Sequence, residues 1–413
     1  MKRYETYKES GIQWLGEIPG HWEVVPVKRL FLFGKGLSIT KSDLVESGQP
    51  VISYGQIHSK QNPGTHIESH LLRYVPMSYA EGNDGAAVSP GDFIFADTSE
   101  DLAGCGNAVY IDKEGIYAGY HTIILRSRKE RSNNKYLAYL FLTDLWRSQI
   151  RSMVFGVKVY SITRAVLSQT SLVIPPTSEQ EAIAAYLDDK VGQIDRLIAE
   201  KEQQMKELQQ YRMSLISETV TRGMNPDVRL KETGIEWIGK IPEHWNAYSL
   251  KRLAQILTGS TPSTEERIYW DNADKNWFTP SDFTDNIYLQ SSERKVSETA
   301  FHDGACRVFP KNTVLIVGIG ATIGKVGITE CECSANQQIN AIIFRNIEFS
   351  KYGAYFLFAK KDYIKSIANA ATLPILNQNG MKELLIPVPP LSEQIAIASF
   401  LDVKTSKIDA TLS

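Results

Sequence analysis

The sequence has few cysteines and no long apolar run. Its four cysteines (Cys105, Cys306, Cys331 and Cys333) do not make a disulfide framework, and Cys331-Glu-Cys333 lacks the spacing of a metal knuckle. No run approaches the ~18–20 apolar residues that span a membrane. The start, MKRYETYKES, lacks the apolar core of a secretion signal. We therefore expect a protein of the reducing cytoplasm.

Net charge is also small, at −2 from 45 basic and 47 acidic residues. This balance argues against a uniformly basic nucleic-acid binder, but it leaves room for local basic surfaces. A hydrophobic fraction of 43% and a charged fraction of 22% are ordinary for folded domains. At ~100–200 residues per domain, 413 residues allow two to four domains.

The chain is internally duplicated. Residues 9–30 match residues 232–253 at 12 of 22 positions, including Ile-Pro-x-His-Trp at 18–22 and 241–245. Residues 175–195 match residues 389–409 at 13 of 21 positions, including Pro-Pro-x-Ser-Glu-Gln. The two copies are too long for a short-period solenoid, so we interpret them as one unit of roughly 200 residues present twice.

Between these ends the copies diverge, although a faint alignment remains. Short β-branched and aromatic runs alternate with Gly, Pro, Asn and Ser, which is typical of β-rich domains. The alignment places Gly36–Thr40 opposite Gly259–Ser263, Val51–Gln56 opposite Trp277–Asp282, Asp92–Phe95 opposite Thr313–Ile316, and Tyr120–Leu125 opposite Ile339–Phe344. Similar ends around divergent middles suggest one scaffold that presents two different reading surfaces.

A long helix is expected after the first β-rich part. Ser178 with Glu181 three residues later forms a capping-box pattern, and no proline interrupts the chain from there to Thr221. Apolar residues alternate by three and four, with Lys201 and Arg212 in the same seam. The length favours a coiled-coil spacer over a surface helix packed on its own domain. A second, shorter helix is expected from Ser392.

Motifs for catalysis are weak. Gly318–Lys325 fails the spacing of a phosphate loop and of a dinucleotide fingerprint, so we interpret its glycines as turn and close-packing residues. Asp282 with Glu293-Arg-Lys295 could belong to a metal-dependent nuclease. However, this pattern of two acidic residues and a lysine occurs often by chance. His21 and His244 are interpreted as packing histidines beside tryptophans, although duplicated catalytic bases are the alternative.

Local charge and amides point instead to nucleic acid. Nine basic and two acidic residues between Arg126 and Arg164 are interleaved with aromatic residues, a pattern suited to phosphate contacts. A solvated face is the alternative interpretation. The second copy offers Asn336, Gln337, Gln338, Asn340, Asn377, Gln378 and Asn379 instead. Such amides can bond adenine bidentately, and they are also common in turns.

The doubled Ile-Pro-x-His-Trp and Pro-Pro-x-Ser-Glu-Gln segments resemble the specificity subunit of Type I restriction-modification enzymes. Thr322–Val326, Asn336–Gln338 and Leu376–Pro390 also look like the target-recognition domains of this family. The resemblance covers essentially the whole chain, in the order domain, helix, domain, helix. It implies an α+β fold with two β-rich target-recognition domains in a pseudo-twofold tandem repeat, separated by long antiparallel coiled-coil spacer helices.

The resemblance also implies domain limits. We expect target-recognition domain 1 at 1–176, a central spacer helix at 177–222, target-recognition domain 2 at 223–390 and a short distal helix at 391–413. Each domain would read one half of a bipartite sequence in double-stranded DNA. We expect DNA contacts from Lys35, Ser38, Thr40, Tyr54, Gln56, Lys158, Tyr160, Arg164, Thr258, Ser260, Thr261, Thr279, Ser281, Thr322, Lys325, Asn377, Gln378 and Asn379.

By the same resemblance, the chain would be non-catalytic and bind no cofactor or metal. Two modification subunits would carry S-adenosylmethionine and the adenine methylation, and restriction subunits would add ATP- and Mg-dependent translocation and cleavage. The alternatives are a stand-alone sequence-specific DNA-binding protein, a nuclease-associated DNA adaptor, a nuclease acting alone, or a scaffold without sequence preference.

Overall fold

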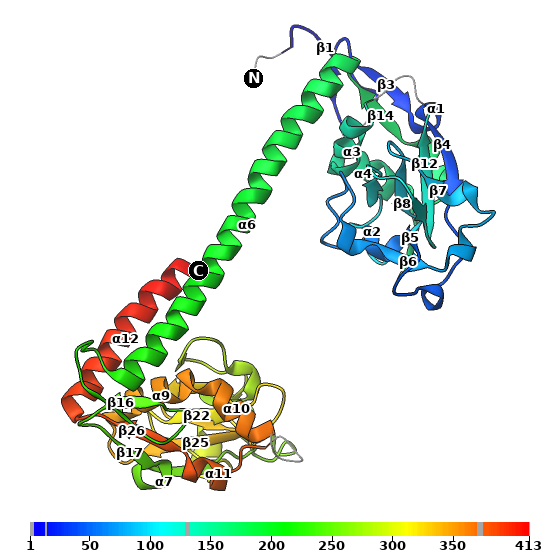
Figure 1. The fold of residues 1–413 in the computed structure, drawn as a ribbon. Coiled ribbons are helices and arrows are strands. Elements are labelled where there is room, and N and C mark those ends of the chain that lie inside the picture. Colours follow the sequence, from blue (N-terminus) through cyan, green and yellow to red (C-terminus); the bar gives the residue numbers. More distant parts are fainter. Residues whose placement is uncertain (1–3, 13–14, 129–132, 370–374, 413) are drawn as a thin grey trace. The chain divides into compact units, whose positions relative to one another are not determined.

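The structure consists of two compact units, which are described separately. The computed structural model describes residues 4–12, 15–128, 133–369 and 375–412. Unit 1 comprises residues 1–198 and unit 2 comprises residues 199–413. Each unit combines β-sheets with helices (Figure 1), in agreement with the expected α+β class. Within the described ranges, no helix is both long and apolar enough to cross a membrane.

In the described part of unit 1, the strands form two four-stranded sheets and three two-stranded ladders. The first sheet has the order β10 (Ala108–Tyr110), β8 (Phe93–Ala96), β12 (Thr122–Ser127), β4 (Phe31–Lys35). The second has the order β6 (Arg73–Val75), β5 (Gln49–Ile52), β11 (Ile116–Ala118), β7 (Ala87–Val88). The ladders are β1 (Tyr7–Glu9) with β2 (Glu17–Pro19), β3 (Glu23–Pro26) with β14 (Ser171–Ile174), and β9 (Thr98–Ser99) with β13 (Tyr160–Ser161).

Helices connect and cover these sheets. They are α1 (Val27–Leu30), α2 (Tyr54–Ile57), α3 (Asn134–Leu142), α4 (Asp144–Arg151) and α5 (Arg164–Gln169), with short 3₁₀ turns at Lys41–Asp43, Ser69–Leu71, Met77–Tyr79 and Asp84–Ala86. Phe141 and Trp146, from α3 and α4, pack with their ring centroids 4.5 Å apart. Phe141 also lies against Phe93 and Phe95 of β8, so these aromatic residues form the core below the first sheet.

Unit 2 has the same kind of organisation. Its main sheet has the order β18 (Ala254–Thr258), β25 (Ile339–Phe344), β22 (Val314–Val317), β23 (Val326–Thr329), β20 (Tyr288–Leu289), and a smaller sheet has the order β21 (Lys295–Val296), β19 (Lys275–Phe278), β24 (Cys333–Ala335). The ladders are β15 (Leu230–Glu232) with β16 (Lys240–Pro242), and β17 (Asn246–Ser249) with β26 (Leu385–Val388). Helices are α7 (Leu250–Leu253), α8 (Glu298–His302), α9 (Phe349–Ala359), α10 (Lys361–Asn369), α11 (Gln378–Glu383) and α12 (Leu391–Leu412), with 3₁₀ turns at Arg267–Tyr269 and Pro280–Asp282.

The central strand of each main sheet is buried on both faces. Phe93 and Phe95 face the helical core of unit 1, whereas Ile94 and Ala96 face the second sheet. In β22, Val314 and Ile316 likewise face a core shared with α9, and Leu315 and Val317 face the smaller sheet. Successive side chains of a strand point to opposite faces, so continuous apolar runs are required at both positions.

The long helix α6 runs from Thr177 to Arg222, close to the expected Ser178–Thr221. The expected capping box at Ser178 is wrong, because the Pro176 carbonyl accepts the amide of Gln180 and Ser178 lies within the first turn. Likewise, the second helix begins at Leu391 and not at Ser392.

Within unit 2, α12 lies beside the C-terminal half of α6 and runs antiparallel to it (Figure 1). The expected seam residue Arg212 is only 5% exposed. Its Nε lies 2.9 Å from Oδ1 of Asp409 on α12, and its guanidinium lies over the Phe358 ring. The polar interruption of the seam is therefore compensated by a carboxylate on the partner helix.

Strand register identifies equivalent positions in the two units. Ile123 pairs with Lys35 in unit 1, and Asn340 pairs with Thr258 in unit 2. The registers of β5 with β11 and of β19 with β24 confirm the alignment of Val51–Gln56 with Trp277–Asp282. The registers of β8 with β12 and of β22 with β25 confirm the alignment of Asp92–Phe95 with Thr313–Ile316. The alignment of Tyr120–Leu125 with Ile339–Phe344 is wrong by two residues, because Thr122 occupies the position of Ile339.

Candidate nucleic-acid interface

The two repeated sequence segments meet each other inside each unit. Nε2 of His21 lies 2.6 Å from Oε1 of Glu179, and the indole Nε1 of Trp22 donates to Oε2 at 3.0 Å. In unit 2, His244 and Trp245 contact Glu393 at the same two distances, 2.6 and 3.0 Å. The doubled histidines therefore support the packing interpretation and not that of catalytic bases.

These contacts lower the pKa of the Glu179 carboxyl group. Desolvation alone would raise the pKa of the Glu179 carboxyl, but hydrogen bonds from His21, Trp22 and Tyr4 outweigh it and hold the pKa below its ordinary value. The neighbouring Gln180 donates from Nε2 to the Pro175 carbonyl at 2.8 Å, and Gln394 donates to the Pro389 carbonyl at 2.6 Å. The glutamate of the Ser-Glu-Gln repeat thus attaches the N-terminal repeat to the helix start in both units, and the glutamine bonds the preceding proline segment.

Four of the ten recognition residues expected in unit 2 line one hollow. It has a volume of about 390 Å³ and is lined by Thr258, Ile319, Gln337, Asn340, Ile375, Leu376, Asn377, Gln378 and Asn379. Gln378 and Thr258 touch, with Nε2 donating to Oγ1 at 2.8 Å. The sequence predicted Thr258 and Asn377–Asn379 as contact residues. It placed Gln337 and Asn340 in an amide-rich run without selecting them.

Two further hydrogen bonds continue inward from Thr258. Its hydroxyl donates to Oδ1 of Asn340 at 2.8 Å, and Nδ2 of Asn340 donates to the Leu376 carbonyl at 2.8 Å. Asn340 is only 5% exposed, so it supports the surface from below. The nearby Thr261 donates to Oε1 of Gln337 at 2.6 Å.

Other expected residues of unit 2 have local structural partners. Thr279 forms a capping box with Asp282, and its hydroxyl lies 2.8 Å from that of Ser281. The Ser260 hydroxyl accepts the Arg307 amide at 2.7 Å. Lys325 donates to the Phe283 carbonyl at 2.7 Å and is half-buried, so its ammonium group stabilises the unit from within. Thr322 is half-buried in the loop before β23.

Unit 1 presents a larger groove of about 750 Å³. It is lined by Tyr54, Gly55, His58, Lys60, Thr98, Ser99, Glu100, Asp101, Ala103, Gly104, Asn107, His121, Arg147 and Val159. Tyr54 is the expected residue that lines it, with its ring against Tyr120 and His121. His58 also lines the groove, although the sequence around it carries no signal that selects it. Tyr160 lies nearby, since β13 pairs with β9.

The remaining expected residues of unit 1 divide into two groups. Lys35, Ser38, Lys158 and Arg164 are exposed at the ends of β4, of α5 and in the connecting loops. Thr40 and Gln56 instead form capping boxes, with Asp43 and Ser53 respectively. The second group therefore has a local structural role, whereas the first presents its side chains to solvent.

The basic run from Arg126 to Arg164 does not form one surface. Arg126 donates to the carbonyls of Gly85 and Ala87, and Arg151 pairs with Asp144 at 2.9 Å. Lys129 and Arg131 lie outside the described residues. Most of the described cations in the run stabilise unit 1 itself, while Lys158 and Arg164 are exposed.

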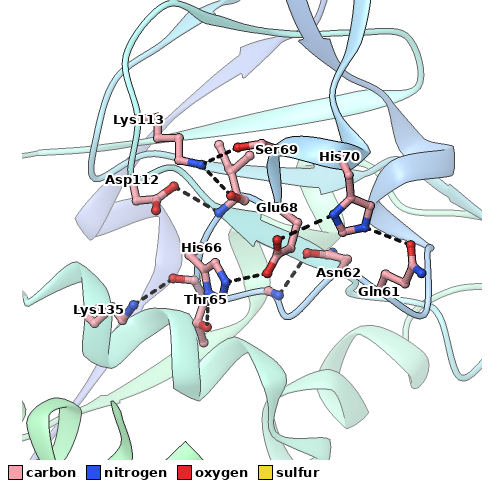
Figure 2. Close-up of polar contacts among 12 residues, drawn as sticks. Gln61, Asn62, Thr65, His66, Glu68, Ser69, His70, Asp112, Lys113 and Lys135 are labelled. Atoms are coloured by element: carbon pink, nitrogen blue, oxygen red, sulfur yellow. Dashed lines mark hydrogen bonds and ion pairs between the residues drawn. The ribbon is translucent and has the colours of Figure 1, made fainter. Parts of the chain in front are cut away.

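A polar network of unit 1 shows the same use of charge (Figure 2). Lys113 donates to the Ile67 carbonyl at 2.9 Å, and Lys135 donates to the Thr65 carbonyl at 3.0 Å. Glu68 lies between two histidines, 3.1 Å from His66 and 3.7 Å from His70. These contacts hold the loop that follows α2.

The candidate catalytic motifs also have structural roles. Asp282, the acid of the nuclease pattern, accepts hydrogen bonds from the Thr279 amide at 2.6 Å and the Glu293 amide at 2.8 Å. Gly320 and Gly324 have φ of 105° and 88°, and a Cβ on Gly324 would approach the Lys361 carbonyl to 2.9 Å. This confirms turn and close-packing glycines. No group of three or more candidate metal ligands occurs among the described residues.

Fold and surface together define a duplicated protein whose two units share one frame and differ in the side chains presented at equivalent positions. The family described as Type I restriction modification DNA specificity domain matches residues 19–207 and 242–412. The chain belongs to this family.

Individual relatives agree with that assignment. The Type I restriction enzyme MjaIX specificity subunit of Methanocaldococcus jannaschii is 37% identical over 180 residues, which are 42% of this chain and 40% of that protein. The putative MjaX specificity subunit of the same organism is 25% identical over 406 residues, 96% of this chain and 89% of the relative.

Solved structures show the same fold. A chain from a study of complex assembly and conformational transition of the type I R-M system has a TM-score of 0.69 at 18% identity, covering 96% of this chain and 93% of that one. The HsdS subunit from Thermoanaerobacter tengcongensis has a TM-score of 0.53 at 17% identity, covering 96% and 92%.

Proposed function

We propose that this chain is the DNA-specificity subunit of a Type I restriction-modification complex, and that each unit reads one half of a bipartite site. The observation that carries the proposal is the duplicated frame. Identical His-Trp-Glu contacts anchor both units, while other equivalent positions carry Lys35 and Arg164 in one unit and Thr258 and Gln378 in the other. Two units with the same internal contacts but different exposed side chains are suited to reading two different DNA sequences.

We further propose that the chain contributes recognition and not chemistry. Partner modification subunits, two per chain, would supply S-adenosylmethionine and adenine methylation, and restriction subunits would supply the ATP- and Mg-dependent steps. The engaged carboxylate of Asp282 and the internal hydrogen bond of Lys325 support this division, because both groups already stabilise the fold.

The test exchanges one reading surface. Residues 31–174 are replaced by the matching segment of a relative, which leaves the frame residues His21, Trp22 and Glu179 in place. With the modification partner present, methylated adenines are then mapped across the host genome. We expect one half of the methylated sequence to change and the other half to stay the same. A change in both halves, or in neither, would refute one-unit, one-half-site reading.

A further inference from the structure

The orientation of the Gln378 amide is determined by the backbone. The Leu376 carbonyl can only accept a hydrogen bond, so Asn340 must direct its Nδ2 toward it and its Oδ1 toward Thr258. The Thr258 hydroxyl therefore donates to Asn340, and its lone pair accepts from Nε2 of Gln378. This chain of bonds assigns nitrogen and oxygen in each amide.

What remains on Gln378 is one N–H and the Oε1 carbonyl. A primary amide has two donors and one acceptor oxygen, and one donor is used on Thr258. Adenine presents an N7 acceptor and an N6 amino donor side by side in the major groove, and a bidentate amide satisfies both. The groups left on Gln378 are therefore those that adenine requires.

Unit 1 places a cation at the same position. Thr163 caps α5 by accepting the Val166 amide, and Asn377 caps α11 by accepting the Gly380 amide, so Arg164 and Gln378 each follow the cap. The carbonyl at the end of each helix confirms this equivalence, since Thr170 accepts the Val27 amide and Leu384 accepts the Leu250 amide.

The residue beside this position also changes from a polar residue in unit 2 to a cation in unit 1. Lys35 replaces Thr258, and the buried Ile123 replaces Asn340, so unit 1 lacks the side chains that orient an amide. Lys35 and Arg164 are exposed, and no ion pair is formed by either with another described residue. Guanine presents two acceptors, O6 and N7, in the major groove, and Arg or Lys is the side chain that donates to both.

We propose that positions 164 and 378 are equivalent base-reading positions, and that Arg164 selects guanine in one half-site while Gln378 selects adenine in the other. This inference rests on the proposed function and adds the identity of one base to each half-site. Asn340 acts in it as a positioning residue, because it orients Gln378 through Thr258 without reaching the surface itself.

The test selects bound duplexes from a random DNA library with the purified full-length chain, as wild type and as Q378R and R164Q variants. For Q378R we expect one adenine to be replaced by guanine in one half-site, because arginine requires no amide orientation. For R164Q we expect loss of one guanine in the other half-site. The preference at each position should change by roughly 5- to 150-fold, and all other positions should stay as in the wild type.

Two further variants serve as controls. Q169A alters an exposed residue at the other end of α5 and should leave the selected sequence unchanged, whereas R164K keeps a donor-only cation and should keep guanine. Retention of adenine by Q378R or of guanine by R164Q would overturn the inference, as would loss of preference throughout both half-sites. A wild-type chain that selects no sequence at all would instead refute the proposed function.

Discussion

At the scale of single residues, a short chain of hydrogen bonds gives Thr258, Asn340 and Gln378 one orientation each. Thr258 illustrates this, since its hydroxyl both accepts from Gln378 and donates to Asn340. Thr258 and Gln378 were expected as DNA contacts from the family resemblance. The link between them is not visible in the sequence, because residues 258, 340 and 378 are distant in the chain and only strand pairing and α11 bring them together.

We expect T258V to weaken adenine selection while T258S preserves it. Valine keeps the shape of threonine but provides no hydroxyl, so the Gln378 amide loses its orienting partner and Asn340 loses a donor. The adenine preference should fall by about 0.5–1.5 kcal/mol, the range of a neutral hydrogen bond. Competition binding with duplexes that differ at that one base pair measures the loss. Equal preferences in T258V and T258S would contradict this relay, in which hydrogen bonds run from the Leu376 carbonyl through Asn340 and Thr258 to Gln378.

The Glu179 carboxylate gives a prediction with a defined pH dependence. Its pKa is lowered in the folded state, so the stabilisation is present above the pKa of the unfolded chain and is lost as pH falls through the folded value. E179Q should destabilise unit 1 by about 1–2 kcal/mol near neutral pH, given the partial exposure of this pair. The difference from wild type should shrink between neutral pH and an acidic pH below the ordinary glutamate pKa of about 4.3, as pH falls toward the lowered folded-state value. Thermal unfolding at the two pH values tests this, and a difference that grows in acid would contradict it.

At the scale of elements, the helix pair of unit 2 depends on one asymmetric ion pair. Arg212 is buried, whereas the side chain of Asp409 is 39% exposed. Removing Asp409 leaves a buried guanidinium without its partner, but removing Arg212 leaves a carboxylate that water can solvate. The two substitutions should therefore differ in cost although they break the same contact.

We expect D409A to destabilise unit 2 by about 2–4 kcal/mol and R212M by about 0–1 kcal/mol. Methionine also fills the space beside Phe358, which keeps packing nearly intact. Chemical unfolding followed by tryptophan fluorescence reports the two costs, because the tryptophans of unit 1 are the same in every variant. Equal costs would mean that Arg212 is solvated when Asp409 is absent.

Elements also show where sequence reasoning reaches its limit. The long helix and the duplicated ends were predicted, because a long stretch without proline and repeated sequence segments are visible in the sequence alone. The pairing of Tyr120–Leu125 with Ile339–Phe344 was wrong by two residues. A shift of two keeps every side chain on its face of the strand, so the hydrophobic pattern could not distinguish the two alignments. The hydrogen-bonded register of the strands distinguishes them.

At the scale of the whole molecule, the purified chain should have no methyltransferase, nuclease or ATPase activity. The candidate motifs at Asp282 and Gly318–Lys325 are engaged in a capping box and a tight turn. Incubation with labelled S-adenosylmethionine, duplex DNA and ATP with magnesium tests all three activities in one preparation. Methyl transfer or cleavage by a sample free of partner subunits would place chemistry on this chain.

The relay that ends at Leu376 also constrains how specificity can evolve. Its last acceptor is a main-chain carbonyl, an atom that no substitution at residue 376 removes. An ancestor could change residue 378 to arginine in one step, and once Thr258 or Asn340 has then been replaced, a return to adenine requires those residues to be restored as well. Effects of substitutions at these three sites should therefore be strongly non-additive. Descendants would move readily from adenine to guanine and rarely in the opposite direction.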